Sequence, residues 1–323
     1  MGRPSGFAAM LVAVACLWPG SHARADEWPS RPVKIVVAFA PGGSADQFGR
    51  LMAAELSAAL KQQFFVENRP GNSGAIGSAQ VARAEPDGYT LLIGGSGPHL
   101  TGPAVNPNIG YEPLKDFTHI AMIGADSYAW AANPALGAKS IAELVALAKS
   151  RKDPITSSSP GPGSLGHLLI EQFKRKAGIG IQHVPAPNSG VTDVLGNHIS
   201  MTLTAMMTVG EQVRAGKLLA LAVTSTERNP VFKGIPTFAE QGYPDVRGDT
   251  WFWLCGPKNL PADVVGKLSR DTRRIVQSPK VQDHFQKLAI LTKDLDPAAV
   301  QKFIAEEYAF WAPLAKAAGL RVQ

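Results

Sequence analysis

Apolar runs and helix-period segments alternate along this chain. Residues 33–39 (VKIVVAF) are rich in β-branched side chains and nearly uninterrupted by polar ones, which is typical of a buried strand. Phe48, Met52, Leu56 and Leu60 follow at intervals of four, which places them on one face of a helix. These segments predict a buried strand followed by an amphipathic helix.

The same alternation continues to the C-terminal end. It predicts strands at residues 64–66, 89–93, about 155, 181–184, 201–205 and 218–223, and helices at 75–84, 140–149, from about 164 and from 262 onward. Strands joined through helices pair in parallel with right-handed crossovers, so residues 33–93 predict a parallel sheet. The strand–helix pattern begins again after Ala138, which predicts a second α/β unit.

Two glycine-rich turns, residues 41–46 (PGGSAD) and 160–167 (PGPGSLGH), each lead from a predicted strand into a predicted helix. The first amide N–H groups of a helix have no intrahelical partners and lie at the positive end of the helix dipole. Such a turn is therefore suited to binding an anion. Two of them predict two lobes that hold a carboxylate between them.

Two side chains in these turns have more than one interpretation. Asp46 lies in the first helical turn, where a carboxylate binds free amides, so we expect it to organise the loop. The amides from Gly43 to Ala45 would then bind the anion. His167 lies in the first turn of the second helix, where facing the ligand and tying down the turn are equally open roles.

The first 25 residues have the pattern of a secretory signal peptide. Residues 7–18 form an apolar run that is shorter than the roughly 20 residues needed to cross a bilayer. Residues 23–25 (ARA) form an A-x-A site, so we expect cleavage after Ala25 and export to the periplasm. Acylation at Cys16 is a weaker alternative, because Ala13 stands where a lipoprotein signal usually has Leu.

Composition narrows the range of partners. The chain has 32 Lys and Arg against 26 Asp and Glu, with the charges interspersed and no long basic run. Nucleic-acid binding needs a concentrated basic surface, so we expect no nucleic-acid partner. After cleavage one cysteine, Cys255, remains, which excludes an intrachain disulfide and predicts a small buried core residue.

Catalytic and cofactor motifs are weak or absent. Residues 161–166 match G-x-G-x-x-G, but the next predicted strand ends in residues 185–187 (PAP) and not in an acidic residue, which disfavours a dinucleotide site. The sequence has no P-loop motif, no G-x-S-x-G and no zinc spacing among its histidines. We therefore expect no cofactor and no metal, and we expect His99 and His198 at the surface or in loops.

An ordered set of segments resembles the receptors of tripartite tricarboxylate transporters, the Bug (Bordetella uptake gene) family. The matching segments are residues 28–32 (WPSRP), 39–46 (FAPGGSAD), 66–71 (VENRPG), 86–92 (PDGYTLL), 114–117 (LKDF), 215–225 (AGKLLALAVTS) and 251–252 (WF). Each segment alone is unspecific, but the set in this order covers essentially all of the mature chain.

The resemblance implies an α/β protein with the type II periplasmic binding fold, in which two α/β lobes close over a ligand cleft. It implies lobes at residues 26–126 plus 248–323 and at residues 127–247. It also implies a non-enzymatic, monomeric receptor that captures a small organic carboxylate and delivers it to membrane transporter subunits. A receptor for a membrane sensor kinase and a periplasmic enzyme on the same scaffold remain alternatives.

The resemblance also implies where the ligand binds. The contacts carried over by position are Gly43, Ser44, Asp46, Ser96, Ser159, Ser164 and His167. Asn188, Ser189 and Thr204, at or beside two departures from the family described next, complete the expected contacts. The chain departs from the family where residues 186–188 (APN) replace a usual Tyr-Lys-Gly, and where Thr204 replaces a usual Asp. Both changes predict a roomier pocket for a larger or more anionic carboxylate, either aromatic or an aliphatic di- or tricarboxylate.

Overall fold

The computed structural model describes residues 2, 27–106 and 108–317. Apart from Gly2, the expected signal peptide and its cleavage site after Ala25 lie outside the described residues. Among the described helices, none combines the length and the hydropathy needed to cross a bilayer.

The first half-sheet has the predicted parallel core. β1 (Val33–Val37) lies between β2 (Phe64–Asn68) and β3 (Thr90–Gly95) and pairs in parallel with both. The connections run through α1 (Ser44–Leu60) and α2 (Ala75–Ala82), as the hydrophobic pattern predicts. β1 ends two residues earlier than expected, so that residues 38–43 form the turn into α1.

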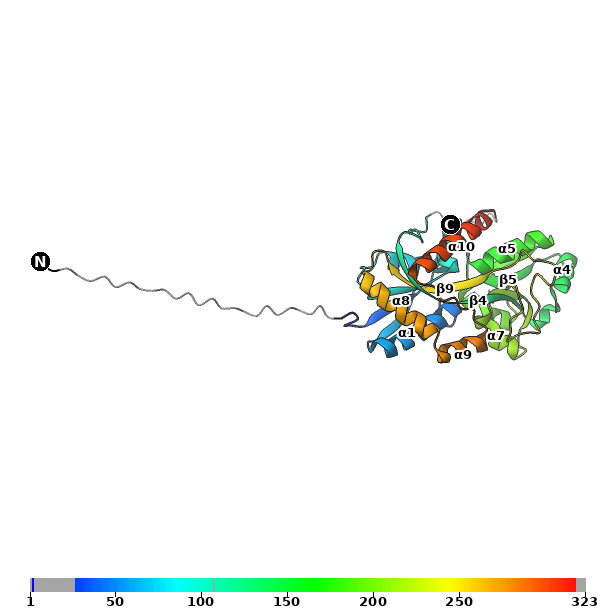
Figure 1. Ribbon diagram of the computed structural model, residues 1–323. Helices are drawn as coiled ribbons and strands as arrows, with labels where there is room; N and C mark the ends of the chain where they lie inside the picture. Colours follow the sequence, from blue (N-terminus) through cyan, green and yellow to red (C-terminus); the bar gives the residue numbers. More distant parts are fainter. Residues whose placement is uncertain (1, 3–26, 107, 318–323) are drawn as a thin grey trace.

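Two long antiparallel strands join the two halves of the molecule. β4 (Phe117–Ala132) pairs along residues 117–127 with β9 (Asp249–Pro257), and β9 also pairs with β3. The last residues of β4 pair instead with strands of the second half-sheet. In Figure 1, β4 and β9 run between the end of the molecule that carries α1 and the end that carries β5.

The second half-sheet continues from β4. Its strands follow the order β4, β7 (Met201–Ala205), β5 (Ile155–Ser159), β6 (Ile181–Pro185), and β8 (Leu219–Val223) pairs with the other edge of β4. β5 is parallel to both its neighbours, as expected of a second strand–helix unit. The helices of this half are α4 (Ile141–Ser150), α5 (Leu165–Ala177), α6 (Val191–Leu195) and α7 (Met206–Arg214).

The C-terminal segment returns to the first half and is helical, as predicted. It forms α8 (Ala262–Val276), α9 (Pro279–Leu288) and α10 (Pro297–Ala317). α8 packs on α1 and β4, and α10 packs on β4 and on the short helices that follow β3. Those short elements are η2 (Gly97–Thr101), a π-helix, and α3 (Gly102–Val105); the others are η1 (Asn72–Gly74), η3 (Pro134–Leu136) and η4 (Pro187–Gly190).

Each half has an aromatic centre. In the first half Phe48 of α1 packs against Phe252 and Phe285, with ring centroids 4.9 and 5.7 Å away. In the second half the fully buried Trp130 packs against Phe173 and Phe238. The helical stripe predicted for α1 is the face that supplies Phe48 to this core.

His99 does not lie at the surface. Its side chain is buried in η2 between Phe117 and Trp253, and burial lowers its pKa well below the usual value. The π-helix turns the imidazole inward, which the sequence pattern does not reveal. His198 is exposed and Cys255 is buried, so both of those expectations are confirmed.

Trp130→Ala should lower the free energy of unfolding by about 3–5 kcal/mol, because it leaves a large cavity between Phe173 and Phe238. Ile76, which is 56% exposed, provides a matched control. Ile76→Ala should change stability by less than about 0.5 kcal/mol. Urea unfolding of both variants measures this, and equal losses would contradict the assigned core.

Candidate ligand-binding cleft

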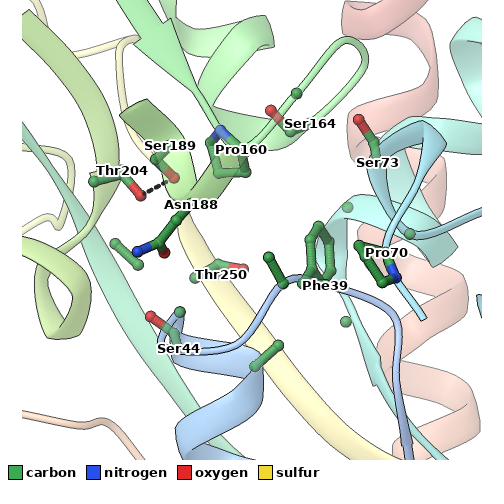
Figure 2. A pocket seen from close by; sticks show the side chains of 18 of the residues that line it. Phe39, Ser44, Pro70, Ser73, Pro160, Ser164, Asn188, Ser189, Thr204 and Thr250 are labelled. Carbon is green, nitrogen blue, oxygen red and sulfur yellow. Dashed lines mark hydrogen bonds between the residues drawn. The ribbon is translucent and has the colours of Figure 1, made fainter. Parts of the chain in front are cut away.

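A pocket of about 490 Å³ lies where turns of the first half face turns of the second half. Figure 2 shows Phe39, Ser44 and Pro70 on one side and Pro160, Asn188 and Thr204 on the other. The lining comes from residues 39–45, 70–74, 95–98, 128, 160–164, 185–189, 204–208, 250 and 252, with a few gaps.

The first glycine turn presents the N-terminus of α1 to the pocket. Gly43 is the N-cap of this helix, and no side chain of the described residues caps it. Gly43, Ser44 and Ala45 all line the pocket. The amides at the start of the helix therefore lie beside the pocket without an intrahelical partner, as the sequence predicts.

Asp46 holds this turn from behind. Its carboxylate accepts hydrogen bonds from the Gly42 amide (3.0 Å), Asn68 Nδ2 (2.9 Å) and Arg50 Nε (2.8 Å). Burial opposes the charge, but these three bonds outweigh it and hold the pKa of Asp46 below its usual value. The side chain is buried and lies outside the pocket lining, and its bonds organise the loop as expected.

The second glycine turn differs from the expected open cradle, because its own side chains occupy its amides. Ser164 caps α5 by accepting a bond from the His167 amide (3.2 Å). The Gly163 amide donates to His167 Nδ1 (3.2 Å), and the Gly161 amide donates to Ser159 Oγ (3.3 Å). His167 therefore ties down the turn, which is one of the two roles that the sequence left open.

Ser159 and His167 accordingly lie outside the pocket lining, whereas Ser164 is part of it. Of the expected contacts, the pocket is lined by Gly43, Ser44, Ser96, Ser164, Asn188, Ser189 and Thr204. Thr204 Oγ1 donates to Ser189 Oγ (2.7 Å), a bond drawn in Figure 2. Ser96 Oγ accepts from the Trp251 amide (2.9 Å), which connects β9 to the pocket edge.

A serine–histidine pair behind the second turn was not predicted. Ser159 Oγ lies 2.7 Å from His183 Nε2, and the His183 ring stacks on His167 at 3.8 Å between centroids. Burial lowers the pKa of both histidines to about 4, so they are neutral at neutral pH. Ser159 is fully buried, and neither Ser159 nor His183 lines the pocket.

A second group of donor side chains lies in the core. One ligand atom each from His99, His119 and Cys255 falls within 4.8 Å of the others, and all three residues are buried. Two imidazoles and a thiol form a donor set that suits a soft metal ion. Burial lowers the pKa of His119 to about 4 and raises that of the Cys255 thiol, so without a metal all three are neutral core groups.

The walls of the pocket carry no formal charge. None of the described residues that line it is a Lys, Arg, His, Asp or Glu. Sequence reasoning missed its apolar surfaces, which come from Phe39 and Phe252 and from a series of prolines: Pro70, Pro98, Pro160, Pro162 and Pro185. A ligand in this pocket meets amides and hydroxyls at defined places and apolar surface elsewhere.

Hydrogen bonds connect the two sides of the pocket. Ser73 Oγ donates to the Pro162 carbonyl, and Thr101 Oγ1 donates to the Gly163 carbonyl at 2.7 Å. On the opposite side Gln47 Nε2 donates to the Met207 carbonyl at 3.4 Å. The structure therefore holds the first-half turns against the second-half turns.

The model for the tripartite tricarboxylate transporter family receptor matches residues 48–320. The chain belongs to this family. Protein BugT of Bordetella pertussis is 34% identical over 315 residues, which cover 97% of each chain. Among solved structures, the periplasmic binding protein BugD is 31% identical, with a TM-score of 0.87 over 92% of this chain and 100% of BugD.

The R. palustris protein Rpa4515, whose structure was solved with adipate, is also 31% identical. Its TM-score is 0.87 over 91% of this chain and 99% of its own. The receptor described here therefore has the type II, two-lobe fold of periplasmic binding proteins, and the predicted fold class is confirmed.

Asp46→Asn should lower the free energy of unfolding at pH 7 by about 1–3 kcal/mol, because its amide group opposes the surrounding donors. The depressed pKa of Asp46 contributes stability above the unfolded-state pKa, and this is lost as the pH falls. The variant should therefore lose less stability than wild type between pH 6 and pH 3.

Asp283→Asn is the matched control, because the Asp283 side chain is 65% exposed and pairs with the exposed Lys287. It should change stability by less than about 0.5 kcal/mol. Urea unfolding at each pH measures both effects. Equal behaviour of the two variants would show that Asp46 does not hold the turn.

Proposed function

We propose that this receptor captures a small organic carboxylate in the periplasm and delivers it to the membrane subunits of a tripartite tricarboxylate-type transporter. The observation that carries the proposal is the uncharged pocket beside the open N-terminus of α1. An anion is stabilised there by main-chain amides and by the helix dipole without a cationic side chain. Membership of the family supports the delivery step.

The ligand-contact residues follow from this arrangement. The carboxylate binds at Gly43, Ser44 and Ala45, and hydroxyl and amide side chains of the second lobe, Ser164 and Asn188 among them, orient the rest of the ligand. Asp46, Ser159 and His167 act on the turns and not on the ligand. The adipate in Rpa4515 supports a carboxylate as the ligand class.

The body of the ligand packs on apolar surface. Phe39 and the surrounding prolines offer that surface, and Ala186 and Thr204 leave room where the family usually has Tyr and Asp. We therefore assign a carboxylate whose remainder is largely hydrocarbon, either a longer aliphatic diacid or an aromatic acid.

The same proposal divides the chain at positions 126/127 and 247/248, giving lobes of residues 26–126 plus 248–323 and of residues 127–247. The first division falls inside β4, next to the residue where its pairing passes from β9 to β7. The second precedes β9. Bending at these crossing strands would open and close the pocket, as in a hinge.

A thermal-shift panel of adipate, citrate, benzoate and putrescine tests the ligand class. At a concentration a hundred times Kd, a ligand adds about 2.7 kcal/mol to stability, so at least one carboxylate should raise Tm by several degrees. The diamine putrescine should not. Stabilisation by putrescine alone, or by small zwitterionic amino acids alone, would contradict the proposal.

Phe39→Ala tests whether the apolar wall contributes to binding. It should weaken the best carboxylate about tenfold, because the ligand loses apolar contact worth about 1–2 kcal/mol. Phe310→Ala removes an aromatic ring that is 47% exposed and outside the pocket lining, and it should leave the affinity unchanged. Isothermal titration calorimetry compares the two.

For the delivery step, a deletion strain should lose uptake of the same carboxylate.

A further inference from the structure

A buried carboxyl lies directly behind the pocket. Asp126 is in the middle of β4, is fully buried and does not line the pocket. Its Oδ2 accepts hydrogen bonds from the Met207 amide of α7 (2.7 Å) and from Ser44 Oγ (3.2 Å). Its Oδ1 is buried and has no hydrogen-bond partner among the described residues. Ser44 lines the pocket, so one hydroxyl separates Asp126 from the ligand space.

The protonation state of Asp126 determines what Ser44 offers to the ligand. A serine hydroxyl has one proton and two lone pairs, and an ionised carboxylate only accepts. When Asp126 is ionised, the Ser44 hydroxyl donates a hydrogen bond to Asp126. Its lone pairs are then left for Thr208 Oγ1, 3.4 Å away, and for the pocket, where they repel a carboxylate. When Asp126 is protonated, its O–H donates to Ser44 Oγ, and the Ser44 proton is free to bind the ligand.

We propose that Asp126 is a positioning residue that takes up one proton when the pocket captures a carboxylate. The hydroxyl of Ser44 relays this coupling between the ligand and Asp126. The inference rests on the proposed function, because it requires an anionic ligand next to Ser44. The proton comes from solvent and remains on Asp126 in the complex. The ligand stays ionised and accepts the hydrogen bond from Ser44.

The other groups around Asp126 agree with a carboxyl that exchanges its proton near neutral pH. Burial raises the pKa of Asp126 to about 7, the bonds from Met207 and Ser44 lower it, and the charge of Asp249 on β9 raises it. Among the described residues, α7 presents the Met207 amide and the neighbouring Met206 amide to Asp126. On its own strand Asp126 interacts with Tyr128, whose raised pKa keeps it neutral.

Two further charges act on Asp249 and not directly on Asp126. Burial and Glu307 raise the pKa of Asp249 to about 6, and Lys293 lowers it.

On α1, Asp46 is already bonded to Arg50, Gly42 and Asn68. No described cation contacts Asp126, so a bound carboxylate beside Ser44 further favours its protonated form.

Calorimetry with the carboxylate that gives the largest thermal shift tests the coupling. Titrations at pH 8 in two buffers of different ionisation enthalpy should show uptake of close to one proton per ligand. At pH 5.5, where Asp126 is already protonated, uptake should approach zero. The affinity of wild type should fall by up to about tenfold per pH unit above pH 7, which is the linkage expected for one proton.

Asp126→Asn removes the titratable group, and its side-chain oxygen can keep the hydrogen bond from the Met207 amide. This variant should bind without proton uptake, with an affinity that changes less than about twofold between pH 6 and pH 8. Asp249→Asn is the matched control, a buried carboxyl nearby with no bond to Ser44, and it should keep most of the uptake. Ser44→Ala interrupts the relay and should also lose most of it, which keeps the test valid if Asp126→Asn does not fold.

The outcomes separate the two proposals. Tight binding by wild type at pH 8 without proton uptake overturns the relay and leaves the receptor function intact. Proton uptake that Asp249→Asn abolishes and Asp126→Asn retains also overturns it. Failure of every carboxylate in the panel to bind overturns the receptor function, and the relay with it.

Discussion

The proposed recognition of an anion depends on keeping the first amides of α1 unpaired beside the pocket while their turn stays rigid. Asp46 achieves this, because its buried carboxylate binds Gly42, Asn68 and Arg50 from behind. Gly43, the N-cap, has no side chain that could occupy those amides. One negative charge thus organises a site for another without lying in it, and the pocket needs no cationic side chain.

The two glycine turns, alike in sequence, have different roles. The first is open toward the pocket, whereas the second binds its own amides through Ser159, Ser164 and His167. The second turn therefore contributes a preformed wall to the pocket. In the proposed function the carboxylate is held mainly by the first turn, and the second lobe selects the shape of the ligand.

Hydrophobic periodicity was sufficient for the parallel strands and for the helices that cover them, and the glycine-rich segment was sufficient for the open turn of α1. It was not sufficient for β4, because residues 117–132 are rich in alanine and polar residues and pair with strands far along the chain. His99 and Asp126 are buried by contacts that tertiary structure alone creates. The self-capping of the second turn depends on the rotamers of Ser164 and His167, which the sequence composition does not reveal.

The central claim is that main-chain amides at the start of α1 hold the ligand's negative charge. A crystal structure of the complex with the most stabilising carboxylate measures this directly. The account predicts a carboxylate oxygen within hydrogen-bond distance of the Ser44 or Ala45 amide. A carboxylate bound instead by a lysine or arginine, or lying outside this pocket, would contradict it.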